Sequence, residues 1–152
     1  MWLALFLLLF QTQPVPYSHK VHLALGLECK NCHKNPDPGE VMGIPQTPVC
    51  MGCHSTVKKD SPAIQKLAGF HESKKPVPWV RVYQVPGYVF FNHRAHLAAK
   101  GVTCQTCHGP VAERDVLTKE KDISMGACMD CHQKNNASNS CTFCHDERTR
   151  GQ

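Results

Sequence analysis

The sequence predicts a mostly irregular fold of small α-helices with little polypeptide core. Of its 152 residues, ten are cysteine and ten are histidine, and every cysteine falls in one of five Cys-x-x-Cys-His units. Eleven prolines and ten glycines favour loops over long regular elements. A chain of this length forms one domain or two small modules, and this composition leaves too few residues for an ordinary apolar interior.

The five units predict covalently bound haem c. In Cys-x-x-Cys-His, two thiols add to the vinyl groups of one porphyrin, and the adjacent histidine supplies the proximal ligand of the iron. With about 30 residues for each of five haems, the porphyrins themselves must be the core that short helices wrap. The attachment cysteines are Cys29, Cys32, Cys50, Cys53, Cys104, Cys107, Cys128, Cys131, Cys141 and Cys144, and the proximal histidines are His33, His54, His108, His132 and His145.

Other uses of paired cysteines explain less of the pattern. Zinc knuckles do not need a histidine directly after the second cysteine, and a disulfide scaffold leaves the histidines unexplained. A thioredoxin-like redox motif needs a βαβ setting that the sequence does not offer. The formal charge of +5 is offset by haem propionates, at roughly −1 per ferric haem, so we expect no nucleic-acid binding.

Five histidines outside the motifs match the number of distal ligands that five irons need: His19, His22, His71, His93 and His96. Ser18 and Asn92 as N-caps, with Gly26 and Gly101 as stops, predict two short helices that each carry a His-x-x-His pair. Positions i and i+3 of a helix point about 60° apart, so the two histidines of a pair serve different haems. The spacing favours His19 for His33 and His93 for His108, which leaves His22 and His96 for later haems.

The fifth distal ligand is left open by the sequence. His71 follows a predicted helix with Ser61 as N-cap, Pro62 at the first position and a stop at Gly69. Met125 is the rival, three residues before Cys128, and Met42 is a weaker alternative. Thioether ligation would raise the potential of that haem above its bis-histidine neighbours.

An internal duplication organises the chain. Residues 17–60 form a two-haem module and residues 88–152 a three-haem module, because "HLALGLECKNCH" matches "HLAAKGVTCQTCH". Residues 61–87 are the linker, and alternation after Trp79 with a Pro86-Gly87 turn predicts a small β-hairpin near residues 79–91. We expect the aromatic residues of that segment, Trp79, Tyr88, Phe90 and Phe91, to pack on haem faces.

The N-terminus suggests export. Residues 1–16 contain the apolar run "WLALFLLLF", which as a helix would span about 14 Å, roughly half the hydrocarbon core of a bilayer. It lacks a positive start and a clear cleavage site, so we interpret it as a truncated signal or anchor segment. Haem c is attached outside the cytoplasmic membrane, so we expect the periplasm or the extracytoplasmic face of the cytoplasmic membrane, with an extracellular location as the alternative.

Longer stretches resemble the pentahaem cytochrome subunit of alternative complex III, a bacterial quinol:electron-acceptor oxidoreductase: "QPVPYSHKVHLALGLECKNCH", "GIPQTPVCMGCH", "PVPWVRVYQVPGYVFFNHRAHLAAKGVTCQTCHGPV" and "SMGACMDCH". More loosely, the chain is similar to the class III multihaem cytochromes. The resemblance implies a membrane-associated periplasmic protein that passes electrons from an iron–sulfur subunit to a monohaem cytochrome or an oxidase. Tyr83 and Ala127 depart from that family's pattern, which often has histidine and tryptophan there.

We therefore expect an electron-transfer subunit of a membrane-bound respiratory quinol-oxidising complex, without catalytic residues of its own. The alternative is a stand-alone periplasmic or extracellular carrier that self-associates into filaments. A multihaem reductase, such as one acting on nitrite, is a third hypothesis and would need an open axial position on one iron.

Overall fold

The computed structural model describes residues 13–34 and 42–145. Within these residues the chain forms short helices joined by loops, and no β-strand occurs, which confirms the predicted fold class. The elements are α1 (His19–Leu23), α2 (Cys29–Cys32), α3 (Thr47–His54), α4 (Pro62–Glu72), α5 (His93–Ala98), α6 (Cys104–His108), the 3-10 helix η1 (Val111–Glu113), α7 (Met125–Lys134) and α8 (Cys141–Cys144).

Each Cys-x-x-Cys-His motif lies on a helical turn. Helices α2, α6 and α8 begin at the first cysteine of their motif, whereas α3 and α7 begin three residues before it. Capping boxes fix the starts of two of these short helices: Glu28 pairs with Asn31 at α2, and Thr103 pairs with Thr106 at α6. The helical turn matters because it places both cysteines, at i and i+3, on the same side of the helix.

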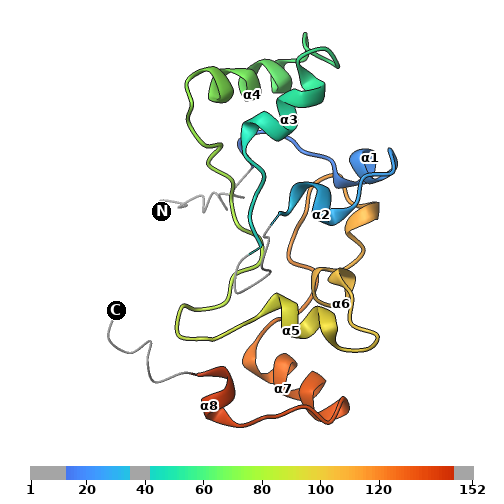
Figure 1. Cartoon of the computed structure of the whole chain (residues 1–152), viewed down its shortest axis with the longest axis vertical. Helices are drawn as coiled ribbons and strands as arrows, with labels where there is room; N and C mark the ends of the chain where they lie inside the picture. Colours follow the sequence, from blue (N-terminus) through green and yellow to red (C-terminus); the bar gives the residue numbers. More distant parts are fainter. Residues whose placement is uncertain (1–12, 35–41, 146–152) are drawn as a thin grey trace, which may run out of the picture.

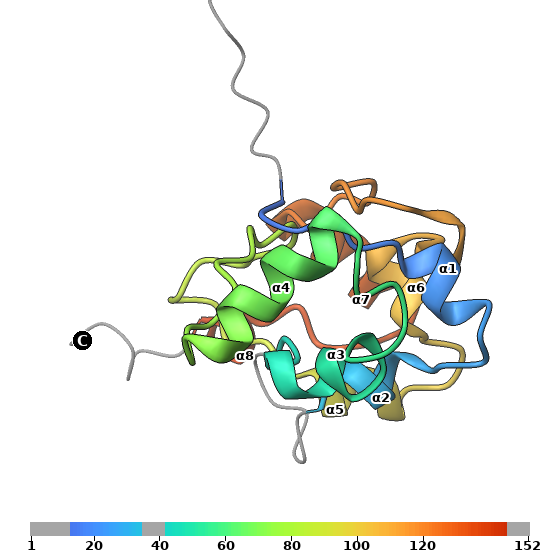
Figure 2. The ribbon, with the colours of Figure 1, turned by 90° about the horizontal axis from the view of Figure 1, so that it is seen from above.

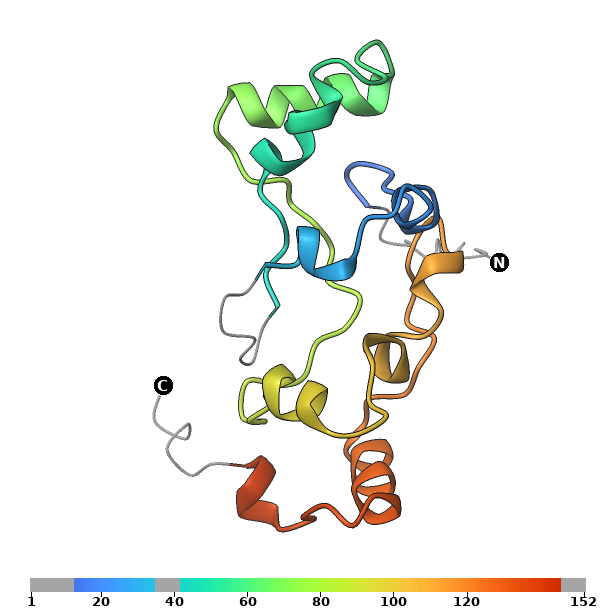
Figure 3. The same ribbon diagram turned by 45° about the vertical axis from the view of Figure 1, so that its right-hand side comes forward.

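The elements are strung out along one long axis (Figures 1 and 3). Helices α3 and α4 lie at one end, α1 and α2 follow, then α5 and α6, and α7 and α8 close the other end. Seen along this axis, α4 lies across the end above the other elements (Figure 2). The spatial order of the motifs therefore differs from their order in the sequence, because the first motif lies between the second and the third.

A few polar contacts between distant segments hold this arrangement. Lys20 of α1 donates its backbone N–H to the Arg114 carbonyl oxygen at 2.9 Å, and the Ser18 hydroxyl donates to Asp115 Oδ1 at 2.6 Å. The Gln13 side-chain amide donates to the carbonyl oxygen of Val80 at 2.8 Å and accepts its N–H at 3.0 Å. These contacts fasten the start of the chain to the middle and to the loop after α6.

The polypeptide builds almost no apolar core, as its composition predicts. Among the described residues, Val15 and Leu67 are the buried apolar side chains and Thr47 is the buried polar one. Large apolar side chains are left on the surface of the chain, including Leu25, Met125 and Phe143, which are 74%, 66% and 60% exposed. A stable protein of this size needs further apolar surface to be covered, which the porphyrins of the predicted haems would supply.

The predicted hairpin near residues 79–91 is wrong. This segment has no strand; it runs as an extended loop with one turn, in which Val89 N–H donates to the Pro86 carbonyl oxygen. Its backbone groups bond to other segments. The Gln13 side chain bonds to the N–H and the carbonyl oxygen of Val80, and Phe90 N–H donates to the Cys144 carbonyl oxygen at 2.7 Å. The alternation of residue types in this segment therefore does not produce a hairpin, because its backbone groups bond to other segments of the chain.

The predicted helices around the additional histidines are confirmed, with one boundary shifted. Helices α1 and α5 end before Gly26 and Gly101, both with φ of +82°, a conformation that favours glycine. The helix after Ser61 is α4, but it continues past Gly69 to Glu72. Its last turn is completed by Ser73, whose N–H and hydroxyl both donate to the Gly69 carbonyl oxygen.

No helix in the described ranges is long and apolar enough to cross a membrane. The predicted signal or anchor segment lies mostly in residues 1–12, outside the described part.

Leu67 offers a test of how much the packing of α4 on α3 contributes to stability. We expect Leu67→Ala to lower the free energy of unfolding of the haem-loaded protein by about 2–4 kcal/mol, because a buried side chain is lost without a replacement. The adjacent, exposed Lys66→Ala should change it by at most about 0.5 kcal/mol. Denaturant unfolding followed by far-UV circular dichroism measures both; equal losses would contradict the packing role.

Candidate metal-binding centres

In four of the motifs, one ring nitrogen of the histidine is hydrogen-bonded to a backbone carbonyl oxygen. Nδ1 lies 2.9 Å from the Gly43 carbonyl oxygen in His33, 3.0 Å from that of Val57 in His54, 2.7 Å from that of Ser138 in His132, and 3.4 Å from that of Tyr88 in His145. A carbonyl oxygen can only accept, so Nδ1 carries the hydrogen in these contacts. The other nitrogen, Nε2, is left with a free lone pair, which is the usual preparation of a histidine for metal binding.

The second histidine of each His-x-x-His pair is prepared in the same way. His22 Nδ1 lies 2.7 Å from the Ser18 carbonyl oxygen and His96 Nδ1 lies 2.8 Å from that of Asn92, each one helical turn back. His71 differs, because its Nδ1 contacts the Thr47 hydroxyl at 3.2 Å, and a hydroxyl can donate or accept. The tautomer of His71 is therefore not set by this contact.

Two pairs of imidazoles from separate helices face each other at similar distances. The ring centroids of His22 on α1 and His54 on α3 are 6.1 Å apart, and those of His96 on α5 and His132 on α7 are 6.0 Å apart. These separations suit a metal ion held between one nitrogen of each ring at about 2 Å. The residues thus fit an iron with two axial imidazoles, and each pair joins a His-x-x-His helix to the second motif of its module.

The first histidine of each pair lies near the first motif of its module. Burial lowers the pKa of His19 to about 4, with smaller contributions from His33 and His22, and its buried Nδ1 has no hydrogen-bond partner. Burial likewise lowers the pKa of His108, followed by the effects of His93 and His33. Low pKa values keep His19 and His108 neutral at pH 7, and the neutral imidazole is the form that binds metals.

The attachment cysteines of neighbouring motifs also approach one another. Burial raises the pKa of Cys29, and the thiol of Cys104, with which it forms a hydrogen bond, raises it further. The pKa of Cys50 is raised by burial and then by Cys32, and that of Cys107 by burial and then by Cys131. All ten cysteines lie in the described residues as free thiols, available for thioether formation.

At the far end, the fifth motif lies close enough to the fourth to affect the pKa of one of its cysteines. Burial raises the pKa of Cys128, and Cys107 and then Cys144 add smaller increases. The effects of cysteines on the pKa values of their neighbours therefore link the motifs in the order second, first, third, fourth, fifth, which is their order along the long axis in Figure 1.

The three candidates for the fifth distal ligand lie in different parts of the molecule. His71 is on α4, at the opposite end of the long axis from α8, which carries the fifth motif (Figure 1). Met125 is the exposed first residue of α7, the neighbour of α8. Met42 is half-buried in the loop before α3.

Sequence reasoning missed the aromatic rings that touch the imidazoles. Tyr17 and Phe91 each contact both histidines of the adjacent pair, and Tyr83 meets the His108 ring edge-on at a centroid distance of 4.7 Å. The Tyr83 hydroxyl accepts the backbone N–H groups of Glu120 and Lys121. The signal for Tyr17 and Phe91 was present, because an aromatic residue stands two positions before the first histidine of each pair.

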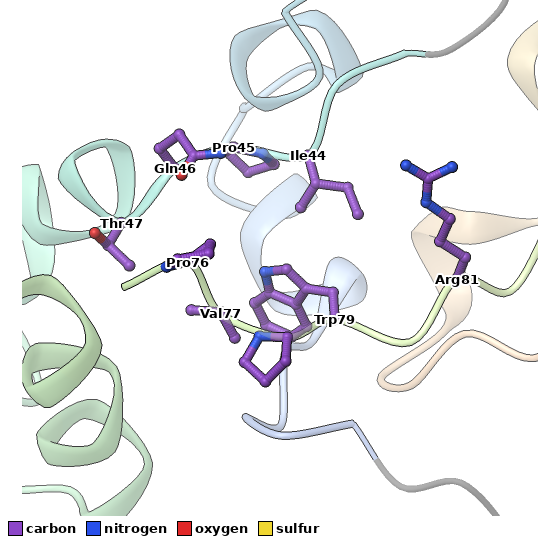
Figure 4. A pocket seen from close by; sticks show the side chains of 9 residues that line it. Ile44, Pro45, Gln46, Thr47, Pro76, Val77, Trp79 and Arg81 are labelled. Atoms are coloured by element: carbon purple, nitrogen blue, oxygen red, sulfur yellow. The ribbon is translucent and has the colours of Figure 1, made fainter. Parts of the chain in front are cut away.

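A pocket of about 220 Å³ lies near the start of α3 (Figure 4). Residues 44–47 form one wall and residues 76–81 the other, with the Trp79 ring facing Ile44 and Pro45. Trp79, which we expected on a haem face, lines this pocket together with Arg81. The lining includes no residue of a Cys-x-x-Cys-His motif, and in the described ranges no three His, Cys, Asp or Glu side chains gather to hold a metal ion by themselves.

Comparison with known proteins agrees with this geometry. Residues 89–146 match the family described as cytochrome c7 and related cytochrome c, and residues 7–81 match the class III cytochrome C family. The chain is 33% identical over 160 residues to a protein of Nitratidesulfovibrio vulgaris named "Menaquinone reductase, multiheme cytochrome c subunit". That alignment covers 88% of this chain and 76% of the relative.

The pairing of His22 with His54 can be tested by spectroscopy. We expect His22→Ala to convert one haem of the loaded protein from low-spin to high-spin, because the iron loses one of its two imidazoles. Lys20→Ala, an exposed position on the same helix, should leave every haem low-spin. Electron paramagnetic resonance and the absorption spectrum measure the spin states; a fully low-spin His22→Ala protein with its full haem content would contradict the pairing.

Proposed function

The chain belongs to the multihaem c-type cytochromes of the class III and c7 type, and we propose that it carries electrons within a membrane-bound, quinone-linked respiratory complex. Transfer of electrons by haem c is the shared property of this family. The finer proposal concerns the number of haems, their ligands and the complex in which they work. The resemblance to alternative complex III implies oxidation of quinol as the direction.

The facing imidazole pairs carry the proposal. The ring centroids of His22 and His54, and of His96 and His132, lie at distances that suit two imidazole ligands on one metal, and the Nδ1 hydrogen bonds leave the Nε2 lone pairs free. A haem iron held this way has no free axial position for a substrate, so it takes up and releases electrons without binding one. This favours a conductor over the reductase hypothesis.

We assign five haems with the following axial pairs: His33 with His19, His54 with His22, His108 with His93, His132 with His96, and His145 with Met125. The pairs His22 with His54 and His96 with His132 rest on the ring contacts. The pairs His19 with His33 and His93 with His108 rest on the lowering of the pKa of His19 by His33, and of the pKa of His108 by His93, beside the larger effect of burial. Ten attachment cysteines in five motifs supply two thioethers to each haem.

Position favours Met125 over His71 at the fifth haem. Met125 and Cys128 stand three residues apart on α7 and therefore share one face of that helix. Cys128 is influenced by Cys144 of the fifth motif, so this face lies toward α8. His71 is on α4 at the other end of the long axis, and its contact with the Thr47 hydroxyl does not set its tautomer.

The order of the motifs suggests where partners bind. Electrons would enter or leave at the two ends of the long axis, beside α3 and α4 or beside α8, because neighbouring motifs connect these ends through the middle. The partners that we propose are an iron–sulfur subunit at one end and a monohaem cytochrome or an oxidase at the other. We place the protein in the periplasm or on the outer face of the membrane.

The name of the relative supports a second direction of transfer. A "Menaquinone reductase, multiheme cytochrome c subunit" belongs to a complex that reduces menaquinone. A series of haems conducts either way according to the potentials at its ends, so this chain could deliver electrons toward quinone in a related complex. Both versions share a subunit bound to quinone-reactive partners.

The complex itself is tested on mildly solubilised membranes. We expect a native gel stained for haem to show the protein in a large band with iron–sulfur and polytopic membrane subunits. Mass spectrometry of this band should find the chain with five haems attached. The quinone-linked proposal fails if the protein runs alone or in a soluble or extracellular fraction, which would favour the carrier or filament reading.

The fifth ligand is tested by a matched pair of variants. We expect Met125→Leu to create one high-spin haem and His71→Leu to leave all spin states unchanged. Met125→His should restore the low-spin state and lower the midpoint potential of that haem, since imidazole favours the ferric iron more than a thioether does. Potentiometric titration followed by absorbance measures this potential; the reverse pattern between Met125 and His71 would give the ligand role to His71.

A further inference from the structure

Tyr17 and Phe91 make the same two contacts in the two modules. The Tyr17 ring meets His19 edge-on, with centroids 4.7 Å apart at 83°, and stacks on His22 at 4.4 Å and 22°. The Phe91 ring meets His93 edge-on at 4.7 Å and 87°, and stacks on His96 at 4.4 Å and 24°. The agreement to a few degrees means that the second module repeats the arrangement of the first with a different aromatic residue.

The start of each helix explains why the ring lies there. Ser18 and Asn92 are N-caps whose side-chain oxygens accept the N–H of Val21 and of Ala95, both at 3.1 Å. The residue before an N-cap commonly packs on the fourth residue of the helix, in a hydrophobic staple. Here the residue before the cap is Tyr17 or Phe91, and the fourth helical residue is His22 or His96.

This staple leaves the stacked imidazole little freedom. Nδ1 of His22 is held by the Ser18 carbonyl oxygen at 2.7 Å, and Nδ1 of His96 by that of Asn92 at 2.8 Å. The hydrogen bond alone would still allow the ring to tilt about it, whereas the aromatic face fixes the plane. The plane of an axial imidazole sets how its orbitals overlap with those of the iron, so it affects both the spectrum and the potential of the haem.

We propose that Tyr17 and Phe91 are positioning residues that set the ring planes of His22 and His96, and with them the electronic properties of the haems those histidines ligate. The inference rests on the distal role given to His22 and His96 in the proposed function. The contact requires a neutral flat ring and not a hydroxyl, since phenylalanine serves in one module.

Single and exchanged variants of the haem-loaded protein test this role. We expect Tyr17→Leu and Phe91→Leu each to shift the low-spin electron paramagnetic resonance signal of one haem, a different one in each variant, and to shift the midpoint potential of that haem. Tyr17→Phe and Phe91→Tyr should keep the original spectrum and potentials. Leu23→Ala, at the half-buried end of the same helix, is the control for a loss of apolar packing that leaves the ring in place.

The outcomes separate this inference from its premise. Unchanged signals in both leucine variants, or equal shifts in Tyr17→Leu and Leu23→Ala, would overturn the positioning role. Should Tyr17→Leu fail to load haem, Tyr17→Met is measured in its place, because methionine fills similar space without a flat ring. If His22→Ala leaves every haem low-spin, the distal assignment itself fails; a high-spin His22→Ala beside an unchanged Tyr17→Leu refutes the positioning role alone.

Discussion

The hydrogen bond from an imidazole Nδ1 to a backbone carbonyl oxygen is the contact on which the candidate centres depend. It recurs at His22, His33, His54, His96, His132 and His145. Each bond selects one tautomer and leaves the lone pair of Nε2 free, and the carbonyl groups come from loops and helix starts. Several loops of the chain thus serve to position histidine rings.

A chain built this way needs little apolar core of its own. Val15 and Leu67 are its buried apolar side chains in the described ranges, while Leu25, Met125 and Phe143 remain open on its surface. Short capped helices supply the local geometry of each motif, and a few long-range hydrogen bonds, such as those of Gln13 with Val80, connect the segments. Stability would then come chiefly from haem binding, because ligation and porphyrin packing act only on the folded chain.

The two His-x-x-His helices have the same surroundings in the structure. Each has a side-chain N-cap, an aromatic residue before the cap and a neighbouring histidine from a Cys-x-x-Cys-His motif, at nearly equal distances. The aromatic residue and the cap differ between the two helices: Tyr17 and Ser18 precede the first, and Phe91 and Asn92 precede the second. What is held constant is the position of two imidazoles, whereas the side chains that achieve it vary within their chemical class.

Sequence alone determined the chemistry of this protein and its local elements. The Cys-x-x-Cys-His motifs, the paired histidines and their caps are short-range patterns, and each was predicted because its spacing has a direct structural meaning. It wrongly predicted a hairpin at residues 79–91, where the chain forms no strand. It did not reveal the contact of Tyr83 with His108 or the partners of His22 and His96. Only the tertiary structure decided the spatial order of the motifs and the separation of His71 from α8, because a protein with almost no apolar core is ordered by contacts between distant loops, which leave no periodic signal in the chain.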